Sequence, residues 1–548
     1  MRWYSSLVVL FSYLVSKSFS IELTTRKGDI EGTEETSRSG RKYYAFKGIP
    51  YAQPPINELR LKNPQPHQGW KGTLDATGDA PLCLQKLIYF PLVRNMTLGQ
   101  EDCLYLNIFT PMLDTREKLP ILVYIHGGGF RMGMSGPKEA PAFFMDEDVI
   151  LVSLHYRLGL LGFLSTGDKT ISGNFGLKDQ AMALKWLYEN INDYGGNPES
   201  IVVFGDSAGA ASTHFLMASP LTRDFIKGGI SQSGVMDAVW ALSPSWRTKQ
   251  ITEQVARMVD CNKGPMLECL QTIDAERLTA TEIELLAWDS DPIIFMPVIE
   301  EVSEGAFMTD DLRNFKNEKP WITGFTNGEA VLKTASLANQ DDSVLYNLAQ
   351  NTDALLPVLL SIRPDSPGFD TFLTLIKEKY FSNVNSKNQL LDQIEKLAND
   401  YFIIYPMSQS LDKHNGPKYA YLLSHRAENS VADRMGPNRL NSPKACHGDE
   451  LLSLFDWSSF FPGTKGRPED RKVSELLVKL WVNFAKTQKP SFEDVPIHWE
   501  NYTNNNFLHI KTENAKMEHI SFDDIKDFWT KAINVLNNEK ENKIKEEL

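Results

Sequence analysis

The chain has 548 residues, of which 42% are hydrophobic and 23% charged, as is typical of a globular protein with a large buried core. Its formal net charge is −13 at pH 7, so its surface should repel the phosphate backbone of nucleic acids. Composition and charge therefore argue against nucleic-acid binding and favour neutral or cationic partners.

Residues 1–20 have the features of a secretory signal peptide. Arg2 supplies a positive charge, residues 7–15 form a short apolar segment, and Ser18 and Ser20 are small residues at the spacing that a signal peptidase recognises. Nine mostly apolar residues are too few to cross a bilayer, which takes about twenty. We therefore expect entry into the secretory pathway, cleavage after Ser20 and no membrane span.

The five cysteines suit an oxidising compartment. Cys83 and Cys103 bracket nineteen residues, and Cys261 and Cys269 bracket seven, so each pair could close a local disulfide. Cys446 is left over and is expected to be a buried thiol.

Two sequons begin at Asn95 and Asn501, and both are expected to carry glycans if the chain enters the secretory pathway. The sequence has neither a CxxC pair nor a histidine-rich tract, so it suggests no metal site.

Short apolar runs along the chain predict buried parallel strands at residues 121–125, 149–153, 200–204 and 228–231. Between two of these strands, residues 177–192 predict a helix with Ala181, Leu184 and Leu187 on one face. This alternation predicts an α/β sheet with right-handed crossovers.

The region from about 335 to 415 is predicted to be mostly helical and to pack over the carboxyl ends of the strands, where sites form in such sheets. Since no linker divides the chain, residues 21–536 are expected to form one domain. A mobile charged tail is expected at residues 537–548.

The third strand runs directly into the sequence GDSAG at residues 205–209. A G-x-S-x-G motif between a strand and a helix is a nucleophile elbow. The sharp turn leaves no room for side chains at its glycines and lifts Ser207 to the N-terminus of a helix, whose dipole favours negative charge. Ser207 is therefore the predicted nucleophile, while Asp206 is expected to be structural or to line the rim of the site.

The strand at residues 121–125 ends in HGGGF at residues 126–130. Consecutive glycines let bare backbone N–H groups approach a substrate oxygen, as in the glycine loops of esterases and lipases. The alternative is a simple glycine turn, which its position upstream of a complete elbow disfavours.

In this kind of hydrolase an acid and a histidine follow the serine. His447 precedes Gly448, which provides a turn that could expose the ring, although an ordinary surface histidine is the alternative. Glu329 lies just past a strand predicted at residues 321–325. From order and spacing alone, Glu329 is one candidate acid among many.

Taken together, the motifs resemble the type-B carboxylesterase and cholinesterase family over nearly the whole chain after the signal peptide. The matching stretches also include FKGIPYAQPP (46–55), EDCLYLN (101–107), YRLGLLGF (156–163), GNFGLKDQ (173–180) and SQSG (231–234), and LSTGD (164–168) is similar to insect members in particular. The resemblance implies an α/β-hydrolase fold, with a large, mostly parallel sheet flanked by helices and helical insertions over the site.

The resemblance also assigns roles to residues. It gives Glu329 the acid role, although Ala330 stands where the family usually has glycine. It makes the backbone N–H groups of Gly128, Gly129 and Ala208 the oxyanion hole. It places Ser233 behind the catalytic triad of Ser207, Glu329 and His447, and Trp240 in the lining of the acyl pocket. It implies disulfides Cys83–Cys103 and Cys261–Cys269 and ion pairs Arg60–Glu101 and Arg157–Asp179.

The function implied is hydrolysis of a small-molecule carboxylic ester through an acyl-enzyme, without a cofactor. The preferred hypothesis is a general carboxylesterase that acts on small apolar or xenobiotic esters. Cholinesterases hold a cation over a tryptophan in the loop between the first two cysteines, and residues 84–102 contain none.

A juvenile hormone esterase, or another lipid-ester hydrolase, remains an alternative, although the elbow of juvenile hormone esterases usually reads GQSAG and this chain has Asp206. A binding or adhesion homologue without catalysis is disfavoured because the serine, acid, histidine and glycine loop are all present.

The chain ends in KEEL at residues 545–548, which resembles the KDEL retrieval signal. We therefore expect a KDEL-type receptor as a partner and residence in the lumen of the endoplasmic reticulum, with secretion as the alternative. Residues 522–536 predict a final helix, with Ser521 as N-cap, whose apolar face docks through Ile525, Phe528, Trp529, Ala532 and Leu536.

Overall fold

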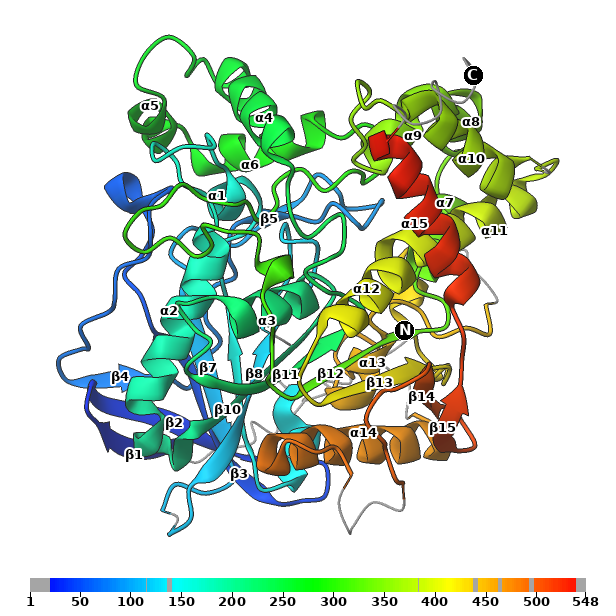
Figure 1. Ribbon diagram of the computed structural model, residues 1–548. Coiled ribbons are helices and arrows are strands. Elements are labelled where there is room, and N and C mark those ends of the chain that lie inside the picture. The colour runs from blue at the N-terminus through cyan, green and yellow to red at the C-terminus, as the bar shows by residue number, and fades with distance from the viewer. Residues whose placement is uncertain are drawn as a thin grey trace, which may run out of the picture.

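The computed structural model describes residues 20–114, 116–135, 140–382, 384–436, 442–461, 466–491 and 497–538 (Figure 1). The signal peptide expected at residues 1–20 and the tail expected at 537–548 lie almost wholly outside these ranges. Within the described ranges, no helix has the length and apolar character needed to cross a membrane.

A twisted sheet forms the centre of the molecule, and its seven middle strands are parallel to one another. In spatial order these are β9 (Ile150–Leu154), β8 (Leu119–Ile125), β10 (Gly196–Asp206), β11 (Ile226–Gln232), β12 (Trp321–Thr326), β13 (Lys418–Leu423) and β14 (Asn506–Ile510). All four strands predicted from apolar runs are present here.

Antiparallel strands extend the sheet at both edges. They are β1 (Ser20–Thr25), β2 (Gly28–Thr36), β3 (Lys42–Pro50) and β7 (Tyr105–Thr110) beside β9, and β15 (Ala515–His519) beside β14. The short strand β4 (Thr73–Asp75) pairs with β2, and β5 (Gln85–Lys86) pairs with β6 (Thr97–Leu98) in a separate ribbon.

Helices cover both faces of the sheet, which is why its middle strands are apolar throughout. Alternate residues of β8 contact different layers: Ile121 and Val123 belong to one core, and Leu122 to the other. The first core includes α2 (Phe175–Asn190) and α3 (Ala208–Ala218), and the second includes α14 (Pro468–Thr487). The predicted helix at 177–192 corresponds to α2.

A group of helices at the upper right of Figure 1 rises from the carboxyl end of the sheet. It contains α7 (Val331–Ala338), α8 (Asp342–Gln350), α9 (Thr352–Leu359), α10 (Phe369–Phe381), α11 (Lys387–Ala398), the π-helix η5 (Asn399–Ile404) and α12 (Tyr405–Lys413). We call residues 331–413 the helical wall. The predicted helical region at about 335–415 is therefore present.

The final helix, α15 (Asp523–Asn538), packs against the helical wall as expected. Its Trp529 and Ala532 have no exposed surface and share a core with Phe372 of α10. Ser521 accepts a hydrogen bond from the Asp523 N–H at 3.2 Å, so it caps the first turn. The helix continues two residues past 536, where the domain was expected to end.

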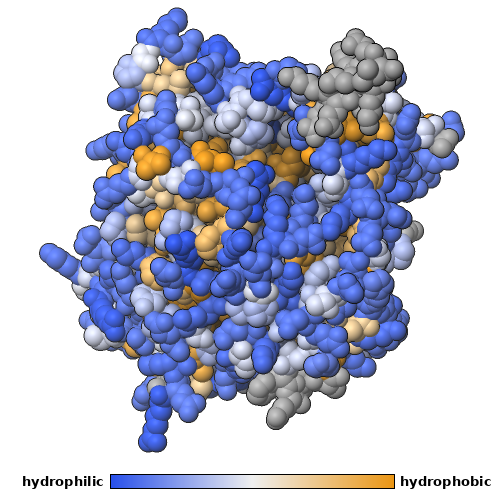
Figure 2. Space-filling view, in the orientation of Figure 1, coloured by the Kyte–Doolittle hydropathy of each residue, from blue (hydrophilic) through white to orange (hydrophobic). Residues whose placement is uncertain are grey.

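A second group of helices lies at the upper left of Figure 1: α4 (Ser245–Met258), α5 (Met266–Thr272) and α6 (Ala275–Glu284). Apolar side chains gather along a hollow between these helices and the helical wall (Figure 2). The remaining helices are short: η1 (Asn57–Leu59), η2 (Ala140–Asp146), α1 (Gly159–Phe163), η3 (Ile191–Tyr194), η4 (Leu312–Asn314), η6 (Val431–Arg434) and α13 (Asp449–Leu454).

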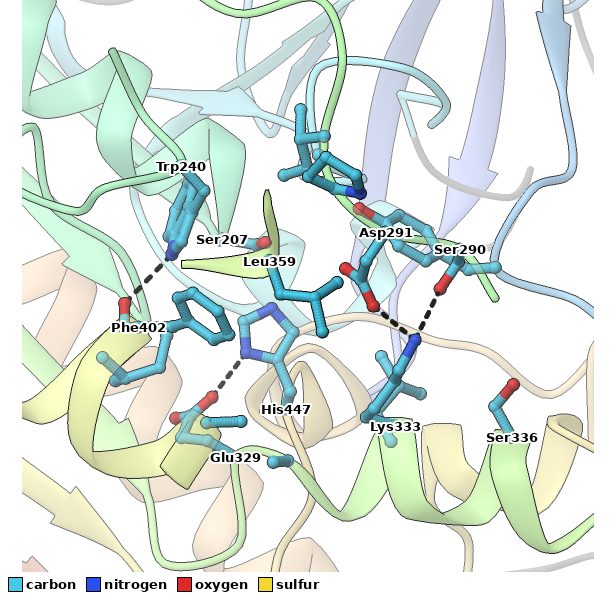
Figure 3. Close-up of a pocket in the computed structure, with 18 of the residues that line it drawn as sticks. Ser207, Trp240, Ser290, Asp291, Glu329, Lys333, Ser336, Leu359, Phe402 and His447 are labelled. Atoms are coloured by element: carbon cyan, nitrogen blue, oxygen red, sulfur yellow. Dashed lines mark hydrogen bonds and ion pairs between the residues drawn. The ribbon is translucent and has the colours of Figure 1, made fainter. Parts of the chain in front are cut away.

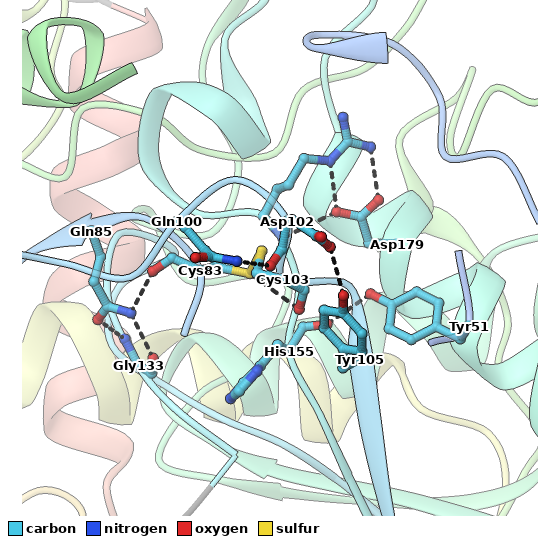
Figure 4. The surroundings of a disulfide bond; sticks show 11 residues. Tyr51, Cys83, Gln85, Gln100, Asp102, Cys103, Tyr105, Gly133, His155 and Asp179 are labelled. Carbon is cyan, nitrogen blue, oxygen red and sulfur yellow. Dashed lines mark hydrogen bonds and ion pairs between the residues drawn. A yellow bond between two sulfur atoms is a disulfide. The ribbon is translucent and has the colours of Figure 1, made fainter. Parts of the chain in front are cut away.

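Both expected disulfides are formed. Cys83 is bonded to Cys103 (Figure 4), Cys261 is bonded to Cys269, and Cys446 is a buried free thiol.

Both expected ion pairs are also present. The Arg60 Nη2 lies 2.6 Å from the Glu101 Oε2, and the Arg157 Nη2 lies 2.7 Å from the Asp179 Oδ1.

Candidate active site

The predicted elbow joins β10 to α3, and Ser207 stands at its apex with φ 55° and ψ −121°. Residues other than glycine rarely adopt this backbone conformation, which costs ~1–3 kcal/mol and is typical of functional turns. The flanking glycines are obligatory: a Cβ on Gly205 or Gly209 would lie 2.4 Å or 2.0 Å from the Ile125 carbonyl oxygen. Close contact with β8 therefore explains why the motif needs both glycines.

His447 and Glu329 come from two loops that run side by side at the carboxyl end of the sheet. Glu329 follows β12 and His447 precedes α13, and a β-bridge between Gly328 and Cys446 brings the two loops together. The His447 Nδ1 donates to the Glu329 Oε2 at 2.5 Å, and Glu329 is buried. The structure thus brings Glu329 into contact with His447, as one of the acids that order and spacing left open.

Glu329 is held from its other side as well. Its Oε1 accepts hydrogen bonds from the Thr326 N–H at 2.6 Å and from the Ser233 Oγ at 2.7 Å. Ser233 therefore lies behind the histidine and acid, where the resemblance places it. These bonds fix the carboxylate and direct its free oxygen at the imidazole.

This carboxylate also controls the charge of His447. Burial alone would lower the pKa of the imidazole, but the charge and hydrogen bond of Glu329 outweigh burial and raise this pKa to about 9. The ring nitrogen opposite the Glu329 bond lies on the side of Ser207 (Figure 3). No hydrogen bond links Ser207 and His447 in the described part of the chain, although both line one cavity.

A second buried acid, Glu450, was not singled out from the sequence. Its Oε1 accepts from the Tyr421 hydroxyl at 3.0 Å and lies 3.2 Å from the Ser233 Oγ. Burial, followed by the charge of Glu329, raises the pKa of Glu450 to about 8. In the sequence it looks like any acid in a first helical turn, so no local signal marks it.

The glycine loop follows β8 and turns sharply. Gly128 and Gly129 have φ of 106° and 64°, and a Cβ on Gly128 would lie 2.0 Å from the Met132 carbonyl oxygen. Asp206 ties this loop to the elbow, since its Oδ1 accepts from the Gly127 N–H at 3.0 Å and from the Tyr124 hydroxyl at 2.9 Å. Asp206 thus has the structural contacts expected of it.

The loops enclose a cavity of about 360 Å³. Ser207, His447, Gly128 and Gly129 line it, and so do apolar side chains of the helical wall, among them Leu348, Leu356, Leu359, Leu397, Phe402 and Ile403. Trp240 also lines it and donates from Nε1 to the Phe402 carbonyl oxygen at 3.0 Å (Figure 3). A cavity of this size with few polar groups suits a small apolar ligand.

One part of the cavity wall is ionic, and the sequence did not reveal it. The Lys333 ammonium lies 2.5 Å from the Asp289 Oδ2, donates to the Ser290 Oγ at 3.1 Å and also donates to Asp291 (Figure 3). It stands 4.7 Å from the centre of the Trp288 ring.

Among the described residues, no group of His, Cys, Asp and Glu side chains could hold a metal ion.

The chain is similar to known proteins over most of its length. The sequence profile described as the carboxylesterase family matches residues 20–529. Venom carboxylesterase-6 of Apis mellifera is 33% identical over 93% of each chain, and a juvenile hormone esterase of Tribolium castaneum is 32% identical over 84% of this chain and 82% of its own.

The fold is also similar to a solved structure. The crystal structure of juvenile hormone esterase from Manduca sexta, with OTFP covalently attached, superimposes with a TM-score of 0.83 at 26% identity, over 94% of this chain and all of that one. With a family match over most of its length, an α/β-hydrolase fold and these relatives, the chain belongs to the carboxylesterase family and is a carboxylic-ester hydrolase.

Proposed function

We propose that Ser207 is the nucleophile, His447 the general base and Glu329 the acid that orients the imidazole. The observation that carries this proposal is the 2.5 Å hydrogen bond from the His447 Nδ1 to the buried Glu329, at the edge of the cavity that Ser207 also lines. A serine, a histidine and a carboxylate in this relation perform acyl transfer on many folds.

In the first step, the Ser207 Oγ forms a bond to the ester carbonyl carbon while its proton moves to the His447 Nε2. The bond from that carbon to the alkoxy oxygen then breaks, and His447 gives the proton to the departing alcohol. In the second step, water repeats this sequence on the acyl-enzyme and releases the acid. The charge of Glu329 stabilises the imidazolium that forms in both steps.

The backbone N–H groups of Gly128, Gly129 and Ala208 are the proposed oxyanion hole. The two glycines line the cavity beside Ser207, and Ala208 opens α3, where helix N–H groups have no intrahelical partner. Such donors act on the charge that develops on the carbonyl oxygen, and each contributes about 10²–10³ in rate.

The substrate proposed is a small apolar or xenobiotic ester, with Trp240 lining the acyl side. The apolar lining supports this class. A choline ester is disfavoured, because residues 84–102 contain no tryptophan and the Lys333 ammonium already lies over the Trp288 ring. A lipid ester such as juvenile hormone is a second candidate, supported by the likeness to juvenile hormone esterases.

The test compares wild type and Ser207→Ala on p-nitrophenyl and naphthyl esters of increasing acyl length, with acetylthiocholine and juvenile hormone included. We expect turnover of short apolar esters by wild type and only weak residual activity in the variant. Equal activity of both proteins would refute the assignment, and a preference for juvenile hormone would favour the second candidate.

We also propose that the enzyme enters the secretory pathway, carries glycans on Asn95 and Asn501, and is retained in the endoplasmic reticulum by a KDEL-type receptor. The two disulfides and the exposure of both asparagines support entry. The KEEL residues support retention. If the full chain and a version without KEEL reach the medium at the same rate, retention is refuted.

A further inference from the structure

Five residues with hydroxyl groups line the active-site cavity: Tyr89, Ser207, Ser290, Ser336 and Ser361. Three of these hydroxyls are hydrogen-bonded to side chains of the protein, namely Ser290 to Lys333, Ser336 to Gln340 and Ser361 to Arg247. Within the described residues, the hydroxyls of Ser207 and Tyr89 have no such partner. Ser207 is the proposed nucleophile, so the hydroxyl of Tyr89 needs its own explanation.

The Tyr89 hydroxyl lies next to the glycine loop. A Cβ built on Gly129 would stand 2.2 Å from the Tyr89 Oη. Because a Cβ is about 1.5 Å from its Cα, this hydroxyl oxygen lies within about 4 Å of the Gly129 Cα. It therefore stands beside one of the proposed oxyanion donors, in the same cavity as Ser207.

Several contacts hold Tyr89 at this place. Its loop is closed by the Cys83–Cys103 disulfide, and the Gln85 side chain makes two hydrogen bonds to the Gly133 backbone, at 2.9 Å and 2.8 Å (Figure 4). Gly133 lies three residues after the glycine loop, so these bonds connect the two loops. On the other side, the Arg131 guanidinium lies 5.5 Å from the centre of the Tyr89 ring.

The hydroxyl keeps its proton under working conditions. Burial raises the pKa of Tyr89 above its usual range, while the nearby charge of Arg131 acts in the opposite direction. At neutral pH the group is a neutral phenol, which can donate one hydrogen bond. A donor without a protein acceptor that lies beside Gly129, in the cavity that Ser207 also lines, has the properties of an oxyanion-stabilising group.

We propose that the Tyr89 hydroxyl donates a hydrogen bond to the ester carbonyl oxygen as negative charge develops on it, beside the N–H groups of the glycine loop. Tyr89 is thus a further catalytic residue, and this role rests on the function proposed above for Ser207. No proton is transferred, and the bond strengthens as the tetrahedral intermediate forms.

The test is Tyr89→Phe, which removes one oxygen atom and leaves the ring in place. We expect kcat on a p-nitrophenyl ester to fall about tenfold to a hundredfold, with KM changed less than about twofold, because the bond is worth most in the transition state. Binding of a trifluoromethyl ketone, which forms an oxyanion on Ser207, should weaken by the same factor. Binding of the matching methyl ketone should not change.

Tyr188→Phe is the matched control, since that hydroxyl is on the surface and donates to Glu199 at 2.8 Å; its kcat should equal that of wild type. An unchanged kcat in Tyr89→Phe, or a change confined to KM, would overturn the proposal and assign Tyr89 a role in pocket shape. If instead Ser207→Ala kept full activity, the proposed function itself would fail.

Discussion

Two of the regions that line the cavity contribute different things. The carboxyl edge of β8, β10 and β12 supplies Ser207, Glu329 and the glycine loop, each within a few residues of a strand end. The helical wall supplies mostly apolar side chains such as Leu359 and Phe402, from helices that follow one another in the sequence. The proposed reactive groups thus lie at the edge of the sheet, and much of the apolar lining comes from the helical wall.

This difference suggests that the sheet edge carries out the chemistry and that the helical wall determines which substrates fit. Groups on the sheet edge are fixed by backbone contacts that tolerate no added atom, as at Gly205 and Gly209. Most residues of the helical wall that line the cavity are apolar, so we expect their substitution to change which ester fits. We therefore expect large effects on kcat at the sheet edge and small, substrate-dependent effects at the wall.

The largest of these effects is expected from Glu329→Gln. The neutral amide cannot stabilise the imidazolium, so kcat should fall about ten-thousandfold while the fold is retained. Steady-state kinetics with a circular-dichroism melt would measure both. A kcat near that of wild type would mean that another acid, such as Glu450, has the role assigned to Glu329.

A smaller effect is expected from pH. His447 must be neutral to accept a proton, and its pKa is raised to about 9, so kcat/KM should be lost as pH falls through this value. Since the charge of Glu450 helps to raise this pKa, Glu450→Gln should shift the profile to lower pH. The exposed Glu428→Gln should leave the profile unchanged, and identical profiles for all three proteins would contradict the coupling.

The smallest effect is expected at the helical wall. Leu359 points into the cavity near His447 (Figure 3), so Leu359→Ala should favour longer acyl chains by about tenfold in relative kcat/KM. Its kcat for a short ester should change little. Val358→Ala, in the same helix but 42% exposed, should not alter chain-length preference. Equal preferences in both variants would show that the wall does not select substrates.

The sequence predicted the sheet edge well because its signals are local. The buried strands are continuous apolar runs, and the elbow and glycine loop lie within a few residues of them, so Ser207 and the loop at 126–130 could be named directly. The choice of Gly128 and Gly129 within that loop came from the family resemblance. Glu329 needed the family resemblance, because the β-bridge that brings it to His447 joins residues more than a hundred positions apart.

Other parts of the site could not be predicted. The ionic contacts of Lys333, the buried Glu450 and the position of Tyr89 beside Gly129 all depend on tertiary packing between distant segments. Tyr89 was visible only as one aromatic residue in the loop between two cysteines. The helical wall was predicted as helical, but periodicity alone does not show which of its side chains reach the cavity.

The central claim, that Ser207 is the nucleophile, is tested most directly by mass spectrometry after treatment with an organophosphate. We predict a single phosphoryl adduct on the peptide that contains Ser207, formed as activity is lost, and no adduct in Ser207→Ala. Inactivation with the adduct on any other residue would contradict the account.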